Sequence, residues 1–257
     1  MPTYVPLNTK DHASKRWKRP VSHAFAQQDI TAPIVGPEFP QAVAAFPIAF
    51  FVRQETVSPV VLLGFEQGQN LFVDQSGHWL GSYTPMVMRV HPFKLARTDS
   101  GQMILCVDQD SELISDDQGE PFFDAGGGPS PAVKAIMELL NHLQAGQAAT
   151  TTACAALARH GVLKPWPLTV KAPSGPIKLD GLFQIDEQAL NTIADDAFLE
   201  LRRAGAIPMA YCQLLSMMRV PSLERLAALK MRKTSQAPTP PADMPKLSLA
   251  DDMFRFG

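Results

Sequence analysis

Short apolar segments separated by turn residues fill the stretch from Glu38 to Phe93, and they constrain the fold more than any other feature. The apolar runs at 47–53, 58–65 and 70–74 have the length of strands, and polar or glycine-containing turns follow them. Strands of this length joined by tight turns are typical of antiparallel sheets. We therefore expect a largely antiparallel, β-rich N-terminal half.

Further strands are predicted on both sides of this stretch. The segments 86–90, 93–97 and 102–108 have strand-like composition, and Thr98–Gly101 between the last two is typical of a hairpin turn. Thr3–Leu7 is predicted to be an edge strand, because a proline inside it lacks the amide that a central strand would need.

The clearest helix signal lies at Ser130 and Pro131. Serine is a favoured N-cap and proline fits the first helical position. Apolar residues at helical spacing then continue to about Leu143. We expect Gly146 to interrupt the helix and a second helix to cover 150–160.

The C-terminal part is expected to follow a β-α-β-α order. Residues 168–171 and 177–185 are predicted to be extended, and a helix is predicted to begin at Asp186. The apolar run Ile207–Met217 is interpreted as a strand, with a helix as the alternative, and Pro221 opens a last helix. Together with the β-rich half, this predicts an α+β fold that packs helices on largely antiparallel strands.

The composition places a domain boundary after residue 231. Residues 1–231 are expected to form one domain, with lobes at 1–128 and 129–231 as the alternative. Residues 232–246 contain four prolines and are predicted to be a proline-rich linker. Residues 247–257 form an acidic and aromatic tail.

The tail carries Met253, Phe254 and Phe256 beside acidic residues. We consider three states for it: docking on the core of the same chain, binding to a protein partner, or disorder. The aromatic side chains favour docking, because they can bury large apolar areas.

Charge and cysteine content exclude several classes of protein. A net charge of −2 gives no electrostatic basis for binding nucleic acid or an anionic membrane. The cysteines Cys106, Cys154 and Cys212 are odd in number and far apart, so we expect reduced, buried thiols. The N-terminus has no signal-peptide core, and no run approaches the roughly 20 apolar residues that span a bilayer. These features predict a cytoplasmic protein.

The sequence offers no familiar catalytic or metal-binding motif. It contains neither CxxC nor HExxH, and no histidine is followed two residues later by a carboxylate. The glycines at 126–128 lack the lysine and the spacing of a phosphate-binding loop. We therefore predict no metal and no cofactor.

Two carboxylates are weak catalytic candidates. Glu38 lies at a predicted helix start beside an apolar strand, where burial would raise the pKa of an acid or base. The structural alternative pairs Glu38 with Arg89 in an ion pair. Asp108 ends a strand, where ligand-binding groups often lie, but it is equally suited to capping a turn.

A ligand-binding groove is the stronger hypothesis. Trp79 and Tyr83 are predicted to lie on a loop after the turn Asp74–Gly77, and such aromatic residues often anchor ligands. Arg89 would pair with a carboxylate, and Phe93 would complete the groove. The structural alternative for the tryptophan is ordinary packing in the core.

Several separate motifs resemble the SapC family over roughly residues 1–230. They are Glu38-Phe39 with Phe46-Pro47-Ile48-Ala49-Phe50, Leu62-Leu63-Gly64-Phe65, Asn70-Leu71-Phe72-Val73-Asp74, Gly77 with Trp79, Tyr83-Thr84-Pro85, Arg89 with Pro92-Phe93, Phe123-Asp124, Gly128-Pro129-Ser130, Gly181 to Glu187, and the terminal Phe254-Arg255-Phe256. One departure is His91, where the family usually carries a tyrosine. The family name comes from an association with a bacterial surface layer. Members tend to be encoded near TonB-dependent receptors, flavin-dependent tryptophan halogenases and cupin-like proteins, which implies an accessory role.

These observations lead to one main hypothesis. The protein is expected to be a non-enzymatic, cytoplasmic accessory protein that recognises a peptide or an aromatic small molecule. It would act with a partner enzyme, such as a flavin-dependent tryptophan halogenase, or with a TonB-linked uptake system. The alternatives are an enzyme of unrecognised type and a surface-layer or secretion component.

Overall fold

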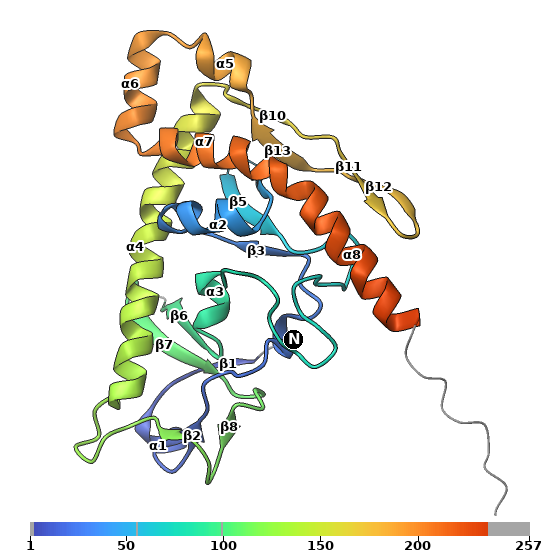
Figure 1. The fold of residues 1–257 in the computed structure, drawn as a ribbon. Coiled ribbons are helices and arrows are strands. Elements are labelled where there is room, and N and C mark those ends of the chain that lie inside the picture. The colour runs from blue at the N-terminus through green and yellow to red at the C-terminus, as the bar shows by residue number, and fades with distance from the viewer. Residues whose placement is uncertain (1–2, 55, 99, 236–257) are drawn as a thin grey trace, which may run out of the picture.

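The computed structural model describes residues 3–54, 56–98 and 100–235, and it has the predicted α+β fold of antiparallel sheets covered by helices (Figure 1). The largest sheet has five strands in the order β10-β13-β4-β5-β3, and every neighbouring pair in it is antiparallel. Its strands are β10 (Leu163–Pro165), β13 (Leu182–Ile185), β4 (Ile48–Arg53), β5 (Thr56–Leu62) and β3 (Thr31–Pro33).

A second, three-stranded sheet has the order β1-β7-β6. Its strands are β1 (Tyr4–Pro6), β7 (Met103–Asp108) and β6 (Phe93–Arg97). The predicted edge strand and the predicted hairpin are both confirmed, with Phe93 opposite Val107 in the β6–β7 register. Asp99, in the turn of that hairpin, lies outside the described residues.

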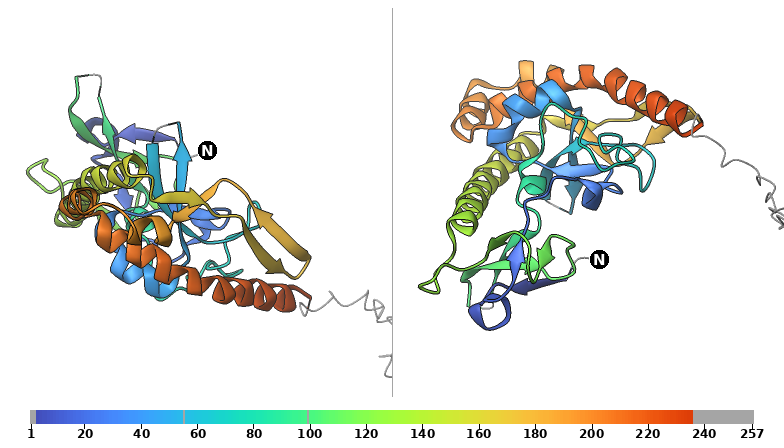
Figure 2. Two further views of the ribbon diagram at one scale, coloured as in Figure 1. Left: turned by 90° about the horizontal axis from the view of Figure 1, so that it is seen from above. Right: turned by 60° about the horizontal axis from the view of Figure 1, so that its bottom comes forward.

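Two small ribbons complete the strands. The strands β2 (Arg16–Trp17), β8 (Ile114–Ser115) and β9 (Glu120–Pro121) form one ribbon, with β2 in the middle. The strands β11 (Leu168–Ala172) and β12 (Gly175–Leu179) form a hairpin that projects beside the last helix (Figure 2).

The helices lie mainly in the second half of the chain. They are α1 (Thr9–His12), η1 (Ala24–Ala26), η2 (Gly36–Glu38), α2 (Phe39–Ala45), α3 (Met86–Arg89), α4 (Pro131–Arg159), α5 (Glu187–Asn191), α6 (Asp195–Arg203), α7 (Ala206–Ser216), η3 (Met217–Arg219) and α8 (Val220–Ser235). The predicted start of α4 is confirmed, because the Ser130 side chain accepts a hydrogen bond from the Val133 amide. None of the described helices is both long and apolar enough to cross a membrane.

The predicted break in α4 is wrong, because one helix of 29 residues continues through Gly146. A Cβ atom at Gly146 would lie only 2.9 Å from Cγ2 of Val35. The glycine therefore permits close packing of α4 on the segment before α2, and it does not end the helix. A glycine in the sequence can therefore indicate either the end of a helix or a close contact along it.

Two predicted strands are helices. Ile207–Met217 lies mostly in α7, which buries Met209, Ala210 and Gln213 on one face. A short apolar run fits a buried helix and a buried strand equally well, so periodicity could not separate them. The C-terminal part consequently has its strands first and its helices afterwards. Residues 86–90 are the second case, because α3 covers most of them.

Three other boundaries also differ. Residues 70–74 contribute only an isolated bridge between Val73 and Trp79. The helix predicted from Asp186 is divided into α5 and α6. The last helix continues to Ser235, so the expected linker begins as helix, while its remainder and the tail, residues 236–257, lie outside the described part of the chain.

Helix α4 connects two hydrophobic cores. Its first half contributes Val133 and Leu140 to a smaller core with Trp17, Phe93 and Phe122. Its second half contributes residues such as Cys154 and Leu157 to a larger core with the five-stranded sheet, α2 and α7. In Figure 1 the helix runs past both sheets. A large cavity lies in the region between the two cores. The three cysteines are free thiols, as predicted, but only Cys106 and Cys154 are buried, and Cys212 is partly exposed. Burial raises the pKa of Cys154 to about 12.

Candidate ligand-binding cavities

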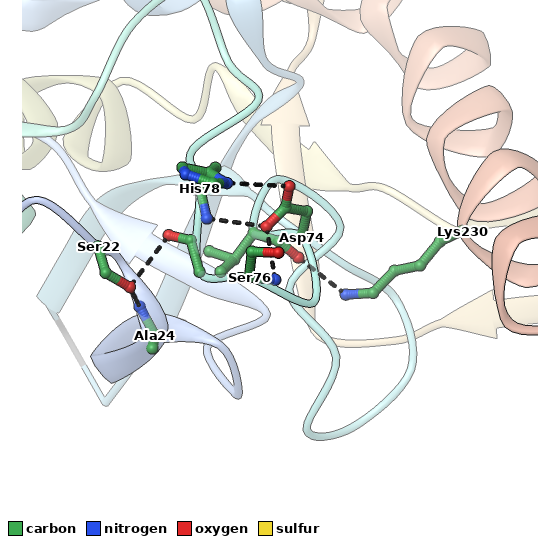
Figure 3. A network of polar contacts seen from close by, with 8 residues as sticks. Ser22, Ala24, Asp74, Ser76, His78 and Lys230 are labelled. Carbon is green, nitrogen blue, oxygen red and sulfur yellow. Dashed lines mark hydrogen bonds and ion pairs between the residues drawn. The ribbon is translucent and has the colours of Figure 1, made fainter. Parts of the chain in front are cut away.

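The predicted turn at Asp74–Gly77 is confirmed, and it positions the loop that follows. Oδ1 of Asp74 accepts hydrogen bonds from the amides of Ser76 (2.8 Å) and His78 (2.9 Å) (Figure 3). These bonds, above all the one from the His78 amide, lower the pKa of Asp74. Lys230 on α8 donates to the Val73 carbonyl at 3.1 Å and so ties the same turn to the last helix.

Trp79 is packed into the protein. Its indole Nε1 donates to the carbonyl of Tyr83 at 2.8 Å, and its ring lies 5.6 Å from the ring of Phe72 in a stacked arrangement. His23 contacts the indole at a ring separation of 5.3 Å. The polar atom of Trp79 is therefore already bonded inside the loop, and the partly buried side chain packs against the larger core.

Glu38 is buried and holds the start of α3. Its carboxylate accepts hydrogen bonds from the Val35 amide (2.9 Å), the Tyr83 hydroxyl (2.9 Å) and the Met86 amide (2.7 Å). Burial, and next the negative charge of Glu38, raise the pKa of Tyr83. The predicted ion pair with Arg89 is wrong: these two described residues have no ion pair within 4.0 Å. The Glu38 carboxylate instead accepts its hydrogen bonds from two backbone amides and the Tyr83 hydroxyl.

A cavity of about 890 Å³ lies between the two cores. Strands β3 and β6 and helices α3 and α4 contribute its walls. Most of the lining is apolar, and it includes Val87, Val90, Leu95, Leu140 and Leu143. We call this space the larger cavity. Its volume is within the range typical of small-molecule and peptide sites.

The charged groups of the larger cavity are mostly acidic. Asp29, Asp108 and Asp110 line it, against a single ammonium group on Lys94. Asp108 is buried and accepts hydrogen bonds from the amides of Thr3 (3.0 Å) and Asp110 (3.3 Å). Partial burial raises the pKa of Asp29. Such a lining attracts a cation on an otherwise apolar ligand.

His91 lies in the same cavity. Its ring stacks on Phe25 with a centroid distance of 3.9 Å, and its Nε2 lies 3.4 Å from the hydroxyl of Ser111. Burial lowers the pKa of His91, although Asp108 and Glu112 act in the opposite direction. A neutral imidazole leaves the acidic charge of this cavity uncompensated at neutral pH.

Strand β6 presents backbone hydrogen-bonding groups on its outer side. Asp108 donates its amide to the Pro92 carbonyl at 2.9 Å, so residues 94 and 96 face β7 and residues 93, 95 and 97 face away from it. No strand among the described residues pairs with this side of β6. Pro33 on the facing strand β3 has no amide to offer, which blunts that edge.

A smaller cavity of about 400 Å³ lies on the other side of α3. The N-terminal segment contributes Trp17, Arg19, Pro20 and His23 to it, and α4 contributes Ile136. The remaining lining comes from Ser82, Tyr83, Thr84, Met88 and Arg89. Met88 lines both cavities. Arg19 and Arg89 are its charged lining residues, and none of the described lining residues is a carboxylate. The lining of the smaller cavity is therefore positively charged, whereas that of the larger cavity is mostly acidic.

Two buried nitrogen atoms at the smaller cavity have no hydrogen-bond partner within the described protein. They are Nε1 of Trp17 and Nδ1 of His23. Trp17 is completely buried. A buried donor without an acceptor costs about 1–3 kcal/mol. The described protein therefore supplies no acceptor for the indole of Trp17, a residue that lines this cavity.

The structure separates the residues that were expected to share one groove. Tyr83 and Arg89 line the smaller cavity, whereas Phe93 and Asp108 line the larger one. Trp79 and Glu38 line neither of these two cavities.

Three further residues that line these cavities were missed. Trp17 gave a usable signal, because a tryptophan in the middle of the basic run 15–19 has no reason to stay solvated. His91 gave a weaker signal, because the resembled family usually carries a tyrosine at this position. Asp29 gave none. Among the residues that the structure describes, no cluster of three or more His, Cys, Asp or Glu side chains is arranged to hold a metal ion.

The comparisons with known proteins identify a family. A family model described as SapC matches residues 7–223. No curated protein and no solved structure matches the chain. The matched segment includes most of both cores, the loop after Asp74, the smaller cavity, and the lining of the larger cavity except Tyr4. The chain therefore belongs to the SapC family.

Proposed function

We propose that this protein is a non-enzymatic binding protein that takes an extended peptide or an aromatic small molecule in the larger cavity. The observation that carries the proposal is the position of that cavity. It is an apolar space of about 890 Å³ bounded by the unpaired edge of β6. Extended peptides bind such edges by adding a strand, with alternate side chains entering neighbouring pockets.

The acidic groups define the ligand further. Asp29, Asp108 and Asp110 favour a ligand that carries an amine or a guanidinium beside its apolar part. Leu95 on the outer side of β6 offers one amide and one carbonyl to a peptide backbone. An aromatic residue next to a basic residue satisfies both features.

The protein is proposed to act as an accessory to a partner. A flavin-dependent tryptophan halogenase or a TonB-linked uptake system is the kind of partner that the family resemblance implies, and the cytoplasm is the proposed compartment. Met253, Phe254 and Phe256 of the tail are the proposed contacts for a protein partner, and they lie outside the described residues.

An acid–base enzyme is the second candidate, and one observation favours it. Asp108 and His91 line the same cavity, so a carboxylate and an imidazole would both reach a bound molecule. Turnover of a bound ligand that is lost in Asp108→Asn, with folding intact, would support this candidate. Binding without turnover supports the accessory role.

A thermal-shift panel tests the proposal. The panel contains aromatic amino acids, indoles, indole amines and short peptides that pair aromatic with basic residues. A ligand at 100 times its Kd should stabilise the folded state by about 2.7 kcal/mol. Leu143→Gln should weaken binding about tenfold, because it removes apolar contact from the cavity wall.

The matched control is Ala145→Gln, which lies on the same helix, is exposed and is not among the residues lining the cavity. Both variants introduce the same residue, and glutamine is a good helix former. The proposal fails if no compound in the panel stabilises the protein, or if both variants weaken binding equally.

A further inference from the structure

We infer that the smaller cavity is an oxyanion site, which binds the carboxylate or phosphate group of an organic molecule. This site is distinct from the larger cavity, and the inference does not depend on the function proposed for it. It rests on the types of hydrogen-bonding group that surround the space, on their burial, and on the charges of the lining side chains.

The first observation is the unpaired indole of Trp17. An indole N–H can only donate a hydrogen bond, so its missing partner must be an acceptor. The side chain is completely buried, and Trp17 is among the residues that line the cavity. Nδ1 of His23 is also buried and unpaired beside the same cavity, and it donates in one of the two neutral tautomers.

The second observation is the charge of the lining. The guanidinium groups of Arg19 and Arg89 belong to this cavity, and its lining contains no carboxylate among the described residues. Arg19 also pairs with Glu120 at 3.3 Å, on an exposed part of the surface. Guanidinium groups bind carboxylates and phosphates through two parallel hydrogen bonds. Donors without acceptors, together with this positive charge, specify an anion with several oxygen atoms.

The third observation concerns the rest of the ligand. The cavity of about 400 Å³ is larger than an isolated ion requires, and Pro20, Met88 and Ile136 give it apolar walls. The oxyanion is therefore one end of a small organic molecule whose other part contacts these side chains. A free inorganic ion would leave the apolar walls unused.

The test uses the indole signals of the full-length protein. The chain has three tryptophans, so a ¹H–¹⁵N correlation spectrum contains three indole signals, and Trp17→Phe assigns the one of interest. Inorganic phosphate and benzoate are titrated separately. The Trp17 signal should shift with saturation, whereas the Trp166 signal should not move.

The variants connect the shift to the cavity. Arg89→Gln should weaken the apparent affinity about tenfold or more, and Arg89→Lys should retain part of it, because the charge stays while the fork of donors is lost. The matched control is Arg97→Gln: Arg97 is also exposed, but it is not among the residues lining this cavity. Circular dichroism confirms that each variant is folded.

The outcomes separate the two sources of oxyanion. A saturable shift with phosphate alone assigns a phosphate ligand, and a shift with benzoate alone assigns a carboxylate ligand. A Trp17 signal that neither anion moves means that the cavity holds solvent only, and it overturns the inference. So does a shift of equal affinity in the Arg89→Gln variant.

Discussion

The two cavities beside α3 share Met88 but differ in the charge of their linings. The larger one combines apolar walls with Asp29, Asp108 and Asp110, whereas the smaller one combines unpaired donors with Arg19 and Arg89. One helix of four residues separates them. The comparison teaches that a very short element can decide which residues act together, because successive residues of a helix point in different directions.

The position of α3 is itself fixed by buried contacts on its N-terminal side. Glu38 bonds the Met86 amide and the Tyr83 hydroxyl, and Trp79 bonds the Tyr83 carbonyl. These residues therefore hold α3, the helix that separates the two cavities, in its position. Substitutions there should lower stability and affect both cavities together, whereas substitutions in the lining should change ligand affinity in one cavity.

The largest effect is expected for Trp79→Ala. Removing a packed indole that stacks on Phe72 should lower the free energy of unfolding by about 3 kcal/mol. Urea denaturation followed by circular dichroism measures it. Leu80→Ala is the matched control, because Leu80 is exposed and should change stability by less than about 0.5 kcal/mol. If Trp79→Ala is stable but no longer binds ligand, Trp79 contacts the ligand directly. That result would support a single aromatic groove and contradict the division into two cavities.

A smaller loss is expected for Glu38→Gln. The glutamine amide places an N–H₂ group where one carboxylate oxygen of Glu38 accepts a hydrogen bond. At least one of the three groups that donate to Glu38 therefore loses its acceptor, which should lower the free energy of unfolding by about 2 kcal/mol. The urea midpoint should fall with an unchanged m-value. Glu187→Gln, at an exposed helix start, should leave the midpoint nearly unchanged. Ligand affinity in both cavities should weaken together, because α3 is their common wall. Weakening in one cavity alone would argue against that shared wall.

The fold could be predicted where a local signal had one meaning. The β6–β7 hairpin follows from two strand-like runs around a turn, and the start of α4 follows from Ser130 and Pro131. The predicted helix break at Gly146 and the predicted strand at Ile207–Met217 were wrong, because each sequence signal has two structural meanings. A glycine permits close packing as well as helix termination, and a short apolar run fits a buried helix as well as a strand.

The cavities could be predicted only in part. A strand over 86–90 would have placed Arg89 and His91 on one face, at alternate positions. The helix α3 instead leaves Arg89 at the smaller cavity and His91 at the larger one. Asp29 lies before β3 and Asp108 ends β7, and they line the same cavity through a tertiary arrangement that no local pattern in the sequence specifies.

The most direct test of the larger cavity compares two tripeptides, whose central residues have opposite charge, by isothermal titration calorimetry. Phe-Arg-Phe amide and Phe-Glu-Phe amide have the same aromatic residues, and the first repeats residues 254–256 of this chain. The acidic lining predicts that the basic peptide binds at least about tenfold more tightly, with a difference that narrows as salt is added. Equal affinities, or tighter binding of the acidic peptide, would contradict the account.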